Sequence, residues 1–127
     1  MDGLAKALWV GVGGFLGANA RYWLGGWVAQ RYGTEFPWGT LFINTSGSFV
    51  LGLFATLATE RVGISPSARL VVAIGFIGAY TTFSTFEYET FGLVESRSWL
   101  IAMSNVLGSV FLGLLAVWLG ARIARLI

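Results

Sequence analysis

The sequence has 127 residues, of which 56% are hydrophobic and 11% are charged, whereas soluble domains carry about a quarter charged residues. It has no cysteine, so disulfides and thiolate chemistry are excluded. It also has no histidine, the usual general base at neutral pH and a common metal ligand, so the sequence offers few groups for enzyme catalysis. The net charge of +2 is too small to indicate nucleic acid binding. The apolar residues fall in four blocks, each near the roughly 20 residues that a membrane-spanning helix needs.

These blocks predict an all-α membrane protein in which residues 1–127 form one transmembrane domain, with helices spanning residues 4–29, 39–59, 66–91 and 98–122. Short connections make neighbouring spans antiparallel and put both termini on one side of the membrane. Basic residues favour that side as cytoplasmic by a mild excess, so the chain can insert in both orientations. On the terminal side are Lys6, Arg61, Arg69, Arg122 and Arg125, against Arg31 and Arg97 on the other, with Arg21 if it reaches that surface.

The first span is rich in glycine and carries a charge near its end. Gly13 and Gly17 are four residues apart, a spacing that lets two helix backbones approach closely in lipid. We therefore expect this face to pack against another helix. Arg21 either extends to the headgroups from the helix end or lies near an aqueous vestibule, and the sequence leaves both possibilities open.

The second span is unusually polar in its first half. Asn44 and Ser48 are four residues apart, so they share one face of the helix. An amide in hydrocarbon needs partners, because an unpaired polar group there costs several kcal/mol. Asn44 therefore either bonds to a neighbouring helix or offers an N–H to a passing anion.

The third span begins at Ser65-Pro66, a pattern typical of an N-cap followed by the first turn of a helix. Its centre, residues 75–89, reads GFIGAYTTFSTFEYE. Gly75 and Gly78 weaken a helix, so we expect an interruption here whose freed carbonyls a cation can satisfy. The alternative is an unbroken helix in which serine and threonine hydroxyls bond back to carbonyls one turn earlier.

The same stretch carries groups that can solvate a small anion. Phe83 and Phe86 project from one face of a helix, and the edge of a phenyl ring carries a partial positive charge. Hydroxyl and amide protons beside those edges complete a set of donors. The fourth span adds a further polar face, because Asn105 and Ser109 are four residues apart.

Three motifs together resemble the Fluc (CrcB) family of fluoride channels. The run TTFSTF at residues 81–86, preceded by GFIGAY and followed by EYE, is similar to the third-helix signature of that family. The second span has the pattern G-T-L-x-x-N at residues 39–44, and the first has G-x-x-G-A-x-x-R at residues 14–21. The resemblance covers nearly the whole chain, and TTFSTF is its most specific part.

The resemblance implies a fluoride-selective ion channel that exports fluoride passively across the inner (cytoplasmic) membrane and so lowers fluoride toxicity. It implies a dual-topology homodimer, in which an antiparallel copy of the chain helps to line two pores within the membrane lipid. Backbone carbonyls of Gly78 and Thr81 would hold a structural sodium ion (Na+) at the dimer centre.

The resemblance also implies roles for individual side chains. Phe83 and Phe86 would line the fluoride path, and Asn44 would donate an amide N–H to it. Arg21 would lie near a vestibule, and Glu89 matches an acidic position of the family. The other polar residues implied along the path are Thr82, Ser84, Asn105 and Ser109.

The sequence departs from the family pattern before the TTFSTF run, where paired glycines are usual. Here Ala79 takes the second position, and the bulky Tyr80 follows it. If the interruption requires a left-handed backbone at Ala79, its methyl group costs about 1 kcal/mol. Asn105 likewise stands where a serine is expected.

Two other functions fit parts of the sequence. Small drug-proton antiporters are also short, four-span and dual-topology, but they need a membrane-embedded carboxylate, and we expect no aspartate or glutamate in mid-span. A non-transporting scaffold subunit explains the glycine-rich faces, but it does not explain the polar phenylalanine-serine-threonine stretch.

Overall fold

The computed structural model describes residues 1–60 and 63–127, and this part of the chain is helical without any β-strand, which confirms the all-α class. Arg61, counted above among the basic residues, and Val62 lie outside the described residues. In chain order the helices are α1 (Gly3–Tyr32), α2 (Trp38–Glu60), α3 (Pro66–Arg69), η1 (Leu70–Ile77), α4 (Gly78–Tyr80), α5 (Phe83–Glu95) and α6 (Trp99–Leu126). The segment η1 is a π-helix, a wider coil that is frequent near functional sites.

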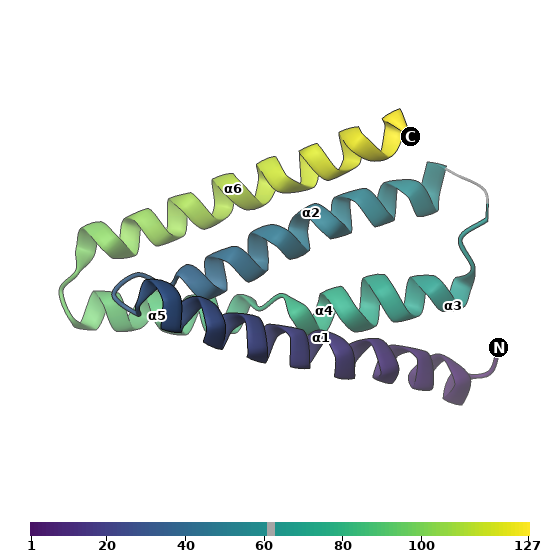
Figure 1. The fold of residues 1–127 in the computed structure, drawn as a ribbon, viewed down its shortest axis with the longest axis horizontal. Coiled ribbons are helices and arrows are strands. Elements are labelled where there is room, and N and C mark those ends of the chain that lie inside the picture. Colours follow the sequence, from purple (N-terminus) through teal and green to yellow (C-terminus); the bar gives the residue numbers. More distant parts are fainter. Residues whose placement is uncertain (61–62) are drawn as a thin grey trace.

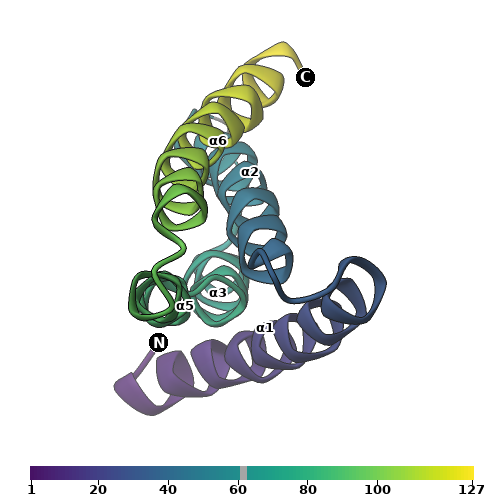
Figure 2. The same cartoon turned by 90° about the vertical axis from the view of Figure 1, so that its left-hand side faces the viewer.

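The long helices run back and forth along one axis, and both termini lie at the same end of the molecule (Figure 1). The predicted antiparallel order of neighbouring segments is therefore confirmed. Seen from the end where α5 turns into α6, α2 and α6 lie side by side, and α1 crosses beneath the run from α3 to α5 (Figure 2).

Three helical segments of the described chain are long and apolar enough to cross a membrane: α2, the run Pro66–Glu95 and α6. They make the chain a multi-pass membrane protein. The helix α1 has 30 residues, more than a span requires, but it is not among the three. Its composition explains the difference, because glycines, Asn19 and Arg21 stand where the other segments have leucine, isoleucine or valine.

Glycines of α1 and η1 bring these two helices into backbone contact. A Cβ atom on Gly13 would overlap the Val71 carbonyl group, and one on Gly17 would overlap the Phe76 carbonyl group. From the η1 side of the same contact, a Cβ atom on Gly75 would come within 2.6 Å of the Val10 carbonyl oxygen and 2.9 Å of the Gly13 Cα atom. The close packing predicted from the four-residue glycine spacing is confirmed.

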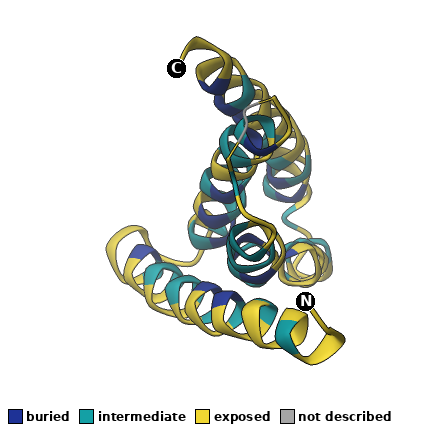
Figure 3. Cartoon of the chain, turned by 90° about the vertical axis from the view of Figure 1, so that its right-hand side faces the viewer, coloured by how far each residue is buried: buried dark blue, intermediate teal, exposed yellow. Residues whose placement is uncertain are grey.

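A second pair of glycines joins α2 to α6. Gly52 faces the backbone of Val117, and Gly120 faces the backbone of Phe49, in both cases too closely for a side chain. The outer faces of α1 and α6 are largely exposed (Figure 3). Exposed apolar side chains on them include Phe15, Leu107, Phe111, Leu114 and Trp118. A surface this apolar is typical of contact with lipid or with another protein.

Two helices with capped N-termini, α3 and α5, begin within the run Pro66–Glu95, here called the third segment. Ser65 caps α3 by accepting a hydrogen bond from the N–H of Ala68, as Ser65-Pro66 predicts. Thr81 and Thr82 then have extended backbone angles, with ψ of 155° and 117°, and they separate α4 from α5. Ala79 lies inside α4 with an ordinary helical backbone, so its methyl group carries none of the left-handed strain considered above.

Candidate functional site

A pocket of about 290 Å³, here called the polar pocket, lies beside the two extended residues. It is lined from α2, from the end of η1, from the stretch around the start of α5 and from α6. The lining residues are Asn44, Gly47, Ser48, Leu51, Ile77, Thr81, Thr82, Phe83, Phe86, Ser109 and Val110. Five of the residues that the resemblance implies along the path therefore surround one pocket, and no charged side chain is among its lining.

Asn44 is bonded to the backbone of Thr82 through both ends of its amide. Its Nδ2–H donates to the Thr82 carbonyl oxygen at 2.9 Å, and its Oδ1 accepts from the Thr82 N–H at 2.7 Å. Of the two possibilities that the sequence left open, the structure shows the interhelical bond. An amide nitrogen has two N–H groups, so a second donor remains beside the pocket that Asn44 lines.

This pairing changes the hydrogen bonding of the preceding helix. An unbroken helix would direct the Thr82 N–H at the carbonyl oxygen of Gly78, but here it donates to Asn44. Thr81 keeps its partner, because its N–H and its Oγ1 both donate to the Ile77 carbonyl oxygen, at 3.0 Å and 2.9 Å. The Gly78 carbonyl thus loses its helical donor. Carbonyl oxygens suit hard cations, so Gly78 and Thr81 fit a Na+ site by donor chemistry.

Phe83 and Phe86 form an aromatic pair on the first turn of α5. Their ring centroids are 5.7 Å apart, and the ring planes are inclined by 41°. Both rings also line a neighbouring pocket of about 450 Å³ together with Glu87 and Thr90. Phe83 is 70% exposed, so most of this residue has no cover within this chain. Ser84 is exposed and lines neither pocket.

Asn105 is the most deeply buried large side chain of the described residues, at 1% exposure, and it lines neither pocket. Its Nδ2–H donates to Thr90 Oγ1 at 2.9 Å, and the Thr90 hydroxyl donates to the Phe86 carbonyl oxygen at 2.7 Å. The hydroxyl of Ser109 donates to Asn105 Oδ1 at 3.4 Å. A single chain of hydrogen bonds thus connects α6 with the start of α5.

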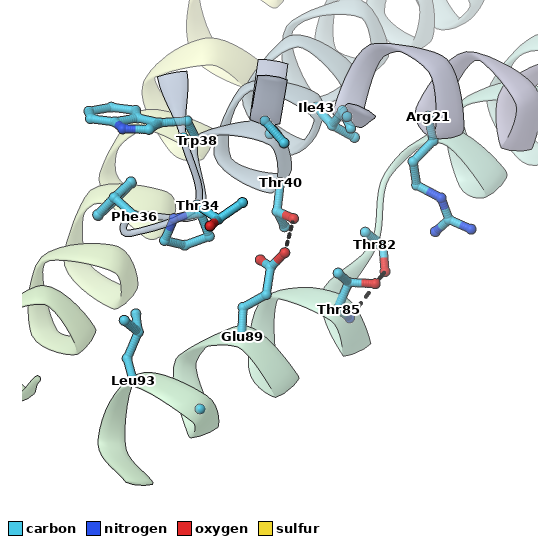
Figure 4. A pocket seen from close by; sticks show the side chains of 16 residues that line it. Arg21, Thr34, Phe36, Trp38, Thr40, Ile43, Thr82, Thr85, Glu89 and Leu93 are labelled. Atoms are coloured by element: carbon cyan, nitrogen blue, oxygen red, sulfur yellow. Dashed lines mark hydrogen bonds between the residues drawn. The ribbon is translucent and has the colours of Figure 1, made fainter. Parts of the chain in front are cut away.

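A larger pocket of about 620 Å³, here called the vestibule, adjoins the polar pocket because Thr82 lines both. The Arg21 side chain points into it from α1, near Thr82 and Thr85 (Figure 4). Across the vestibule the Thr40 hydroxyl donates to Glu89 Oε1 at 2.8 Å. The geometry favours the vestibule over the headgroup position for Arg21.

Sequence reasoning missed two polar pairs that join α2 to the third segment. One is the bond from Thr40 to Glu89. The other joins the Tyr80 hydroxyl to Ser46 at 2.8 Å, where Ser46 also donates to the Ile43 carbonyl oxygen at 3.1 Å. The four-residue spacing of Thr85 and Glu89 was a usable signal for a shared polar face, but no pattern in the sequence identifies the partners on α2.

The family model described as CrcB-like protein, Camphor Resistance (CrcB), matches residues 8–121. A protein of Koribacter versatilis named fluoride-specific ion channel FluC is 54% identical over 118 residues, which cover 93% of this chain and 93% of that protein. Proteins of the same name from Solibacter usitatus and Roseiflexus sp. are 49% and 48% identical, over 94% and 93% of this chain and 98% and 95% of their own. The matched range includes every residue that lines the polar pocket and the vestibule. The chain therefore belongs to the CrcB-like family.

Proposed function

We propose that the chain is a fluoride-specific ion channel that exports fluoride passively across the inner membrane and so lowers fluoride toxicity. The observation that carries this function is the polar pocket, where Phe83 and Phe86 meet the amide of Asn44 and the hydroxyl of Ser109. Relatives that share about half of their residues with this chain are named fluoride-specific ion channels. A channel of this kind is not an enzyme.

The chemistry of the polar pocket favours a small anion that passes through rather than one that stays bound. Ring edges, an amide N–H and hydroxyl protons replace part of the hydration shell of an anion. No charged side chain lines the pocket, so no single site holds the ion too firmly for conduction. In the vestibule Arg21 supplies a positive charge near Thr82, across the pocket from the Glu89 carboxylate that Thr40 holds, and this charge attracts anions to the boundary between the two pockets.

The proposed channel is a dual-topology homodimer of four-span chains in membrane lipid. The 70% exposure of Phe83 supports a second copy, since one chain leaves most of this residue uncovered. In this arrangement α1 is the first span, and Thr81 with Thr82 interrupts the third. Asn105 contributes to the path from behind the lining, and the exposed Ser84 belongs to the part of the path that the partner chain completes.

A structural Na+ belongs to the same proposal. The carbonyl oxygens of Gly78 and Thr81 would hold it at the dimer centre, where the antiparallel copy supplies the same groups. The diversion of the Thr82 N–H to Asn44 supports this, because it leaves the Gly78 oxygen available.

The test is anion efflux from liposomes that contain the purified protein. We expect rapid passive release of fluoride and almost none of chloride, with no proton uptake. Equal release of both anions, or no fluoride release from protein that elutes as a single species, would sink the proposal. Proton-coupled uptake of an organic cation would instead favour the antiporter, for which the Glu89 carboxylate is the available group.

A further inference from the structure

We infer that Asn105 is a positioning residue of the fluoride path. Its side chain connects Ser109, which lines the polar pocket, to the turn of α5 that carries Phe86. The inference rests on the proposed channel function. Asn105 is 1% exposed and bonded on both sides of its amide, to Thr90 and to Ser109. It therefore acts on the path through its neighbours, while they line the pockets.

The donors in this chain of hydrogen bonds can be arranged in only one direction. Thr90 has one hydroxyl proton, which goes to the Phe86 carbonyl oxygen, so its Oγ1 must accept the N–H of Asn105. An asparagine Oδ1 can only accept, so it takes the proton of Ser109. The fixed position of Thr90 on α5 thus fixes the amide of Asn105, and the amide sets the resting position of the Ser109 hydroxyl.

The hydrogen bonds at Thr90 are short, and the hydrogen bond at Ser109 is long. The bonds at Thr90 are 2.7 Å and 2.9 Å, within the usual range, whereas Ser109 lies 3.4 Å from Asn105 Oδ1. Ser109 is therefore held near the amide without being locked to it. When an anion enters the polar pocket, the Ser109 proton can turn to it at little cost, while Thr90 keeps Asn105 in place.

The position of Phe86 depends on the same tie. Phe86 lines the polar pocket and its neighbour of about 450 Å³ and is bonded through its carbonyl oxygen to Thr90, so Asn105 sets the position of this helical turn relative to α6. The buried amide of Asn105 is expected to keep both hydrogen bonds, because leaving the N–H or the oxygen of a buried amide unpaired costs about 1–3 kcal/mol. The bonds at Thr90 therefore hold the Phe86 turn of α5 against Asn105 of α6.

The experiment uses Thr90→Val, which keeps the volume of the side chain and removes the hydroxyl, with Thr90→Ser, which keeps the hydroxyl. We expect Thr90→Val and Asn105→Leu each to lower the fluoride flux by about fivefold or more. Thr90→Ser keeps the hydroxyl and should conduct at nearly the wild-type rate. The double variant should be no slower than Asn105→Leu alone, because both changes cut the same chain. The matched control is Thr59→Val on α2, whose hydroxyl also bonds back to a carbonyl one turn earlier, at 2.9 Å.

A second readout does not depend on conduction. In protein labelled with 4-fluorophenylalanine, the ¹⁹F NMR signal of Phe86, assigned with Phe86→Leu, should move in Thr90→Val and Asn105→Leu and stay in place in Thr59→Val. A Phe86 signal that does not move in Thr90→Val overturns the inference, as does a fluoride flux that stays at the wild-type rate. A moved signal in a protein without fluoride flux would support the tie and contradict the channel function instead.

Discussion

Asn44 pairs its side-chain amide with both backbone groups of Thr82, although the two residues are 38 positions apart in the sequence. One residue of α2 thus provides the hydrogen bonds that the extended stretch between α4 and α5 cannot make with its own helix. It also keeps the Thr82 N–H away from the Gly78 carbonyl. The same side chain lines the polar pocket, so the shape of the backbone and one of the donors of the pocket depend on the same amide.

Replacing Asn44 with leucine should therefore weaken both the fold and the flux. We expect Asn44→Leu to lower the free energy of unfolding by about 1–3 kcal/mol, because the Thr82 carbonyl oxygen loses its donor, and to slow fluoride release sharply with the dimer intact. Thermal unfolding in detergent, size-exclusion chromatography and liposome flux measure the three effects. The control is Asn19→Leu, since Asn19 is exposed and bonds only within α1, at 2.7 Å to the Phe15 carbonyl oxygen. Equal stability and flux in the two variants would contradict the role of the pairing.

The sequence was sufficient for features that depend on local spacing. Helical segments, the Ser65 cap and the close approach at Gly13 and Gly17 follow from residues that lie within two turns of each other. The sequence did not predict which residues far apart in the chain would become hydrogen-bond partners. The spacing of Asn105 and Ser109 put both on one face, but only the packing of α6 on α5 buries Asn105 and leaves Ser109 in the pocket.

The π-helical coil of η1 was also not predicted, and here the reason is tertiary. Gly75 is a local signal of a weak helix, but the backbone contact of η1 with α1 at Gly13 and Gly17 joins residues far apart in the sequence. Composition alone also does not identify α1 as a span. Its glycines serve packing, and they make it less apolar than the three segments that qualify as spans by composition.

Phe83 provides a test of the aromatic contribution to the path. Phe83→Leu keeps an apolar side chain of similar reach but removes the positive ring edge, so we expect fluoride flux to fall roughly two- to tenfold with little change in stability. The matched control is Phe111→Leu on α6, because that ring is 66% exposed and lines neither pocket. If the two variants conduct alike, Phe83 does not meet the anion.

The glycine contacts predict a contrast between two neighbouring positions of α1. A methyl group on Gly17 meets the Phe76 backbone, so Gly17→Ala should lower the free energy of unfolding by about 1–3 kcal/mol through separation of α1 from η1. Nothing lies within 4 Å of a methyl group on Gly14, so Gly14→Ala should be neutral or stabilise the helix by up to about 1 kcal/mol. Thermal unfolding in detergent compares them. Equal losses at both positions would show that the glycines act through backbone flexibility instead of contact.

Removal of sodium tests the carbonyl site at Gly78 and Thr81. If Na+ binds the folded dimer through these oxygens, the midpoint of thermal unfolding should rise with the logarithm of the sodium concentration, because an ion that binds only the folded state stabilises it. Replacing Na+ with N-methyl-D-glucamine at constant ionic strength should lower that midpoint and slow fluoride release, since this cation is too large for a carbonyl cage. Asn44→Leu frees the Thr82 N–H to return to the Gly78 oxygen, so the variant should lose the sodium dependence along with the flux. A wild-type protein whose stability and flux are the same in both cations would show that no such ion is needed.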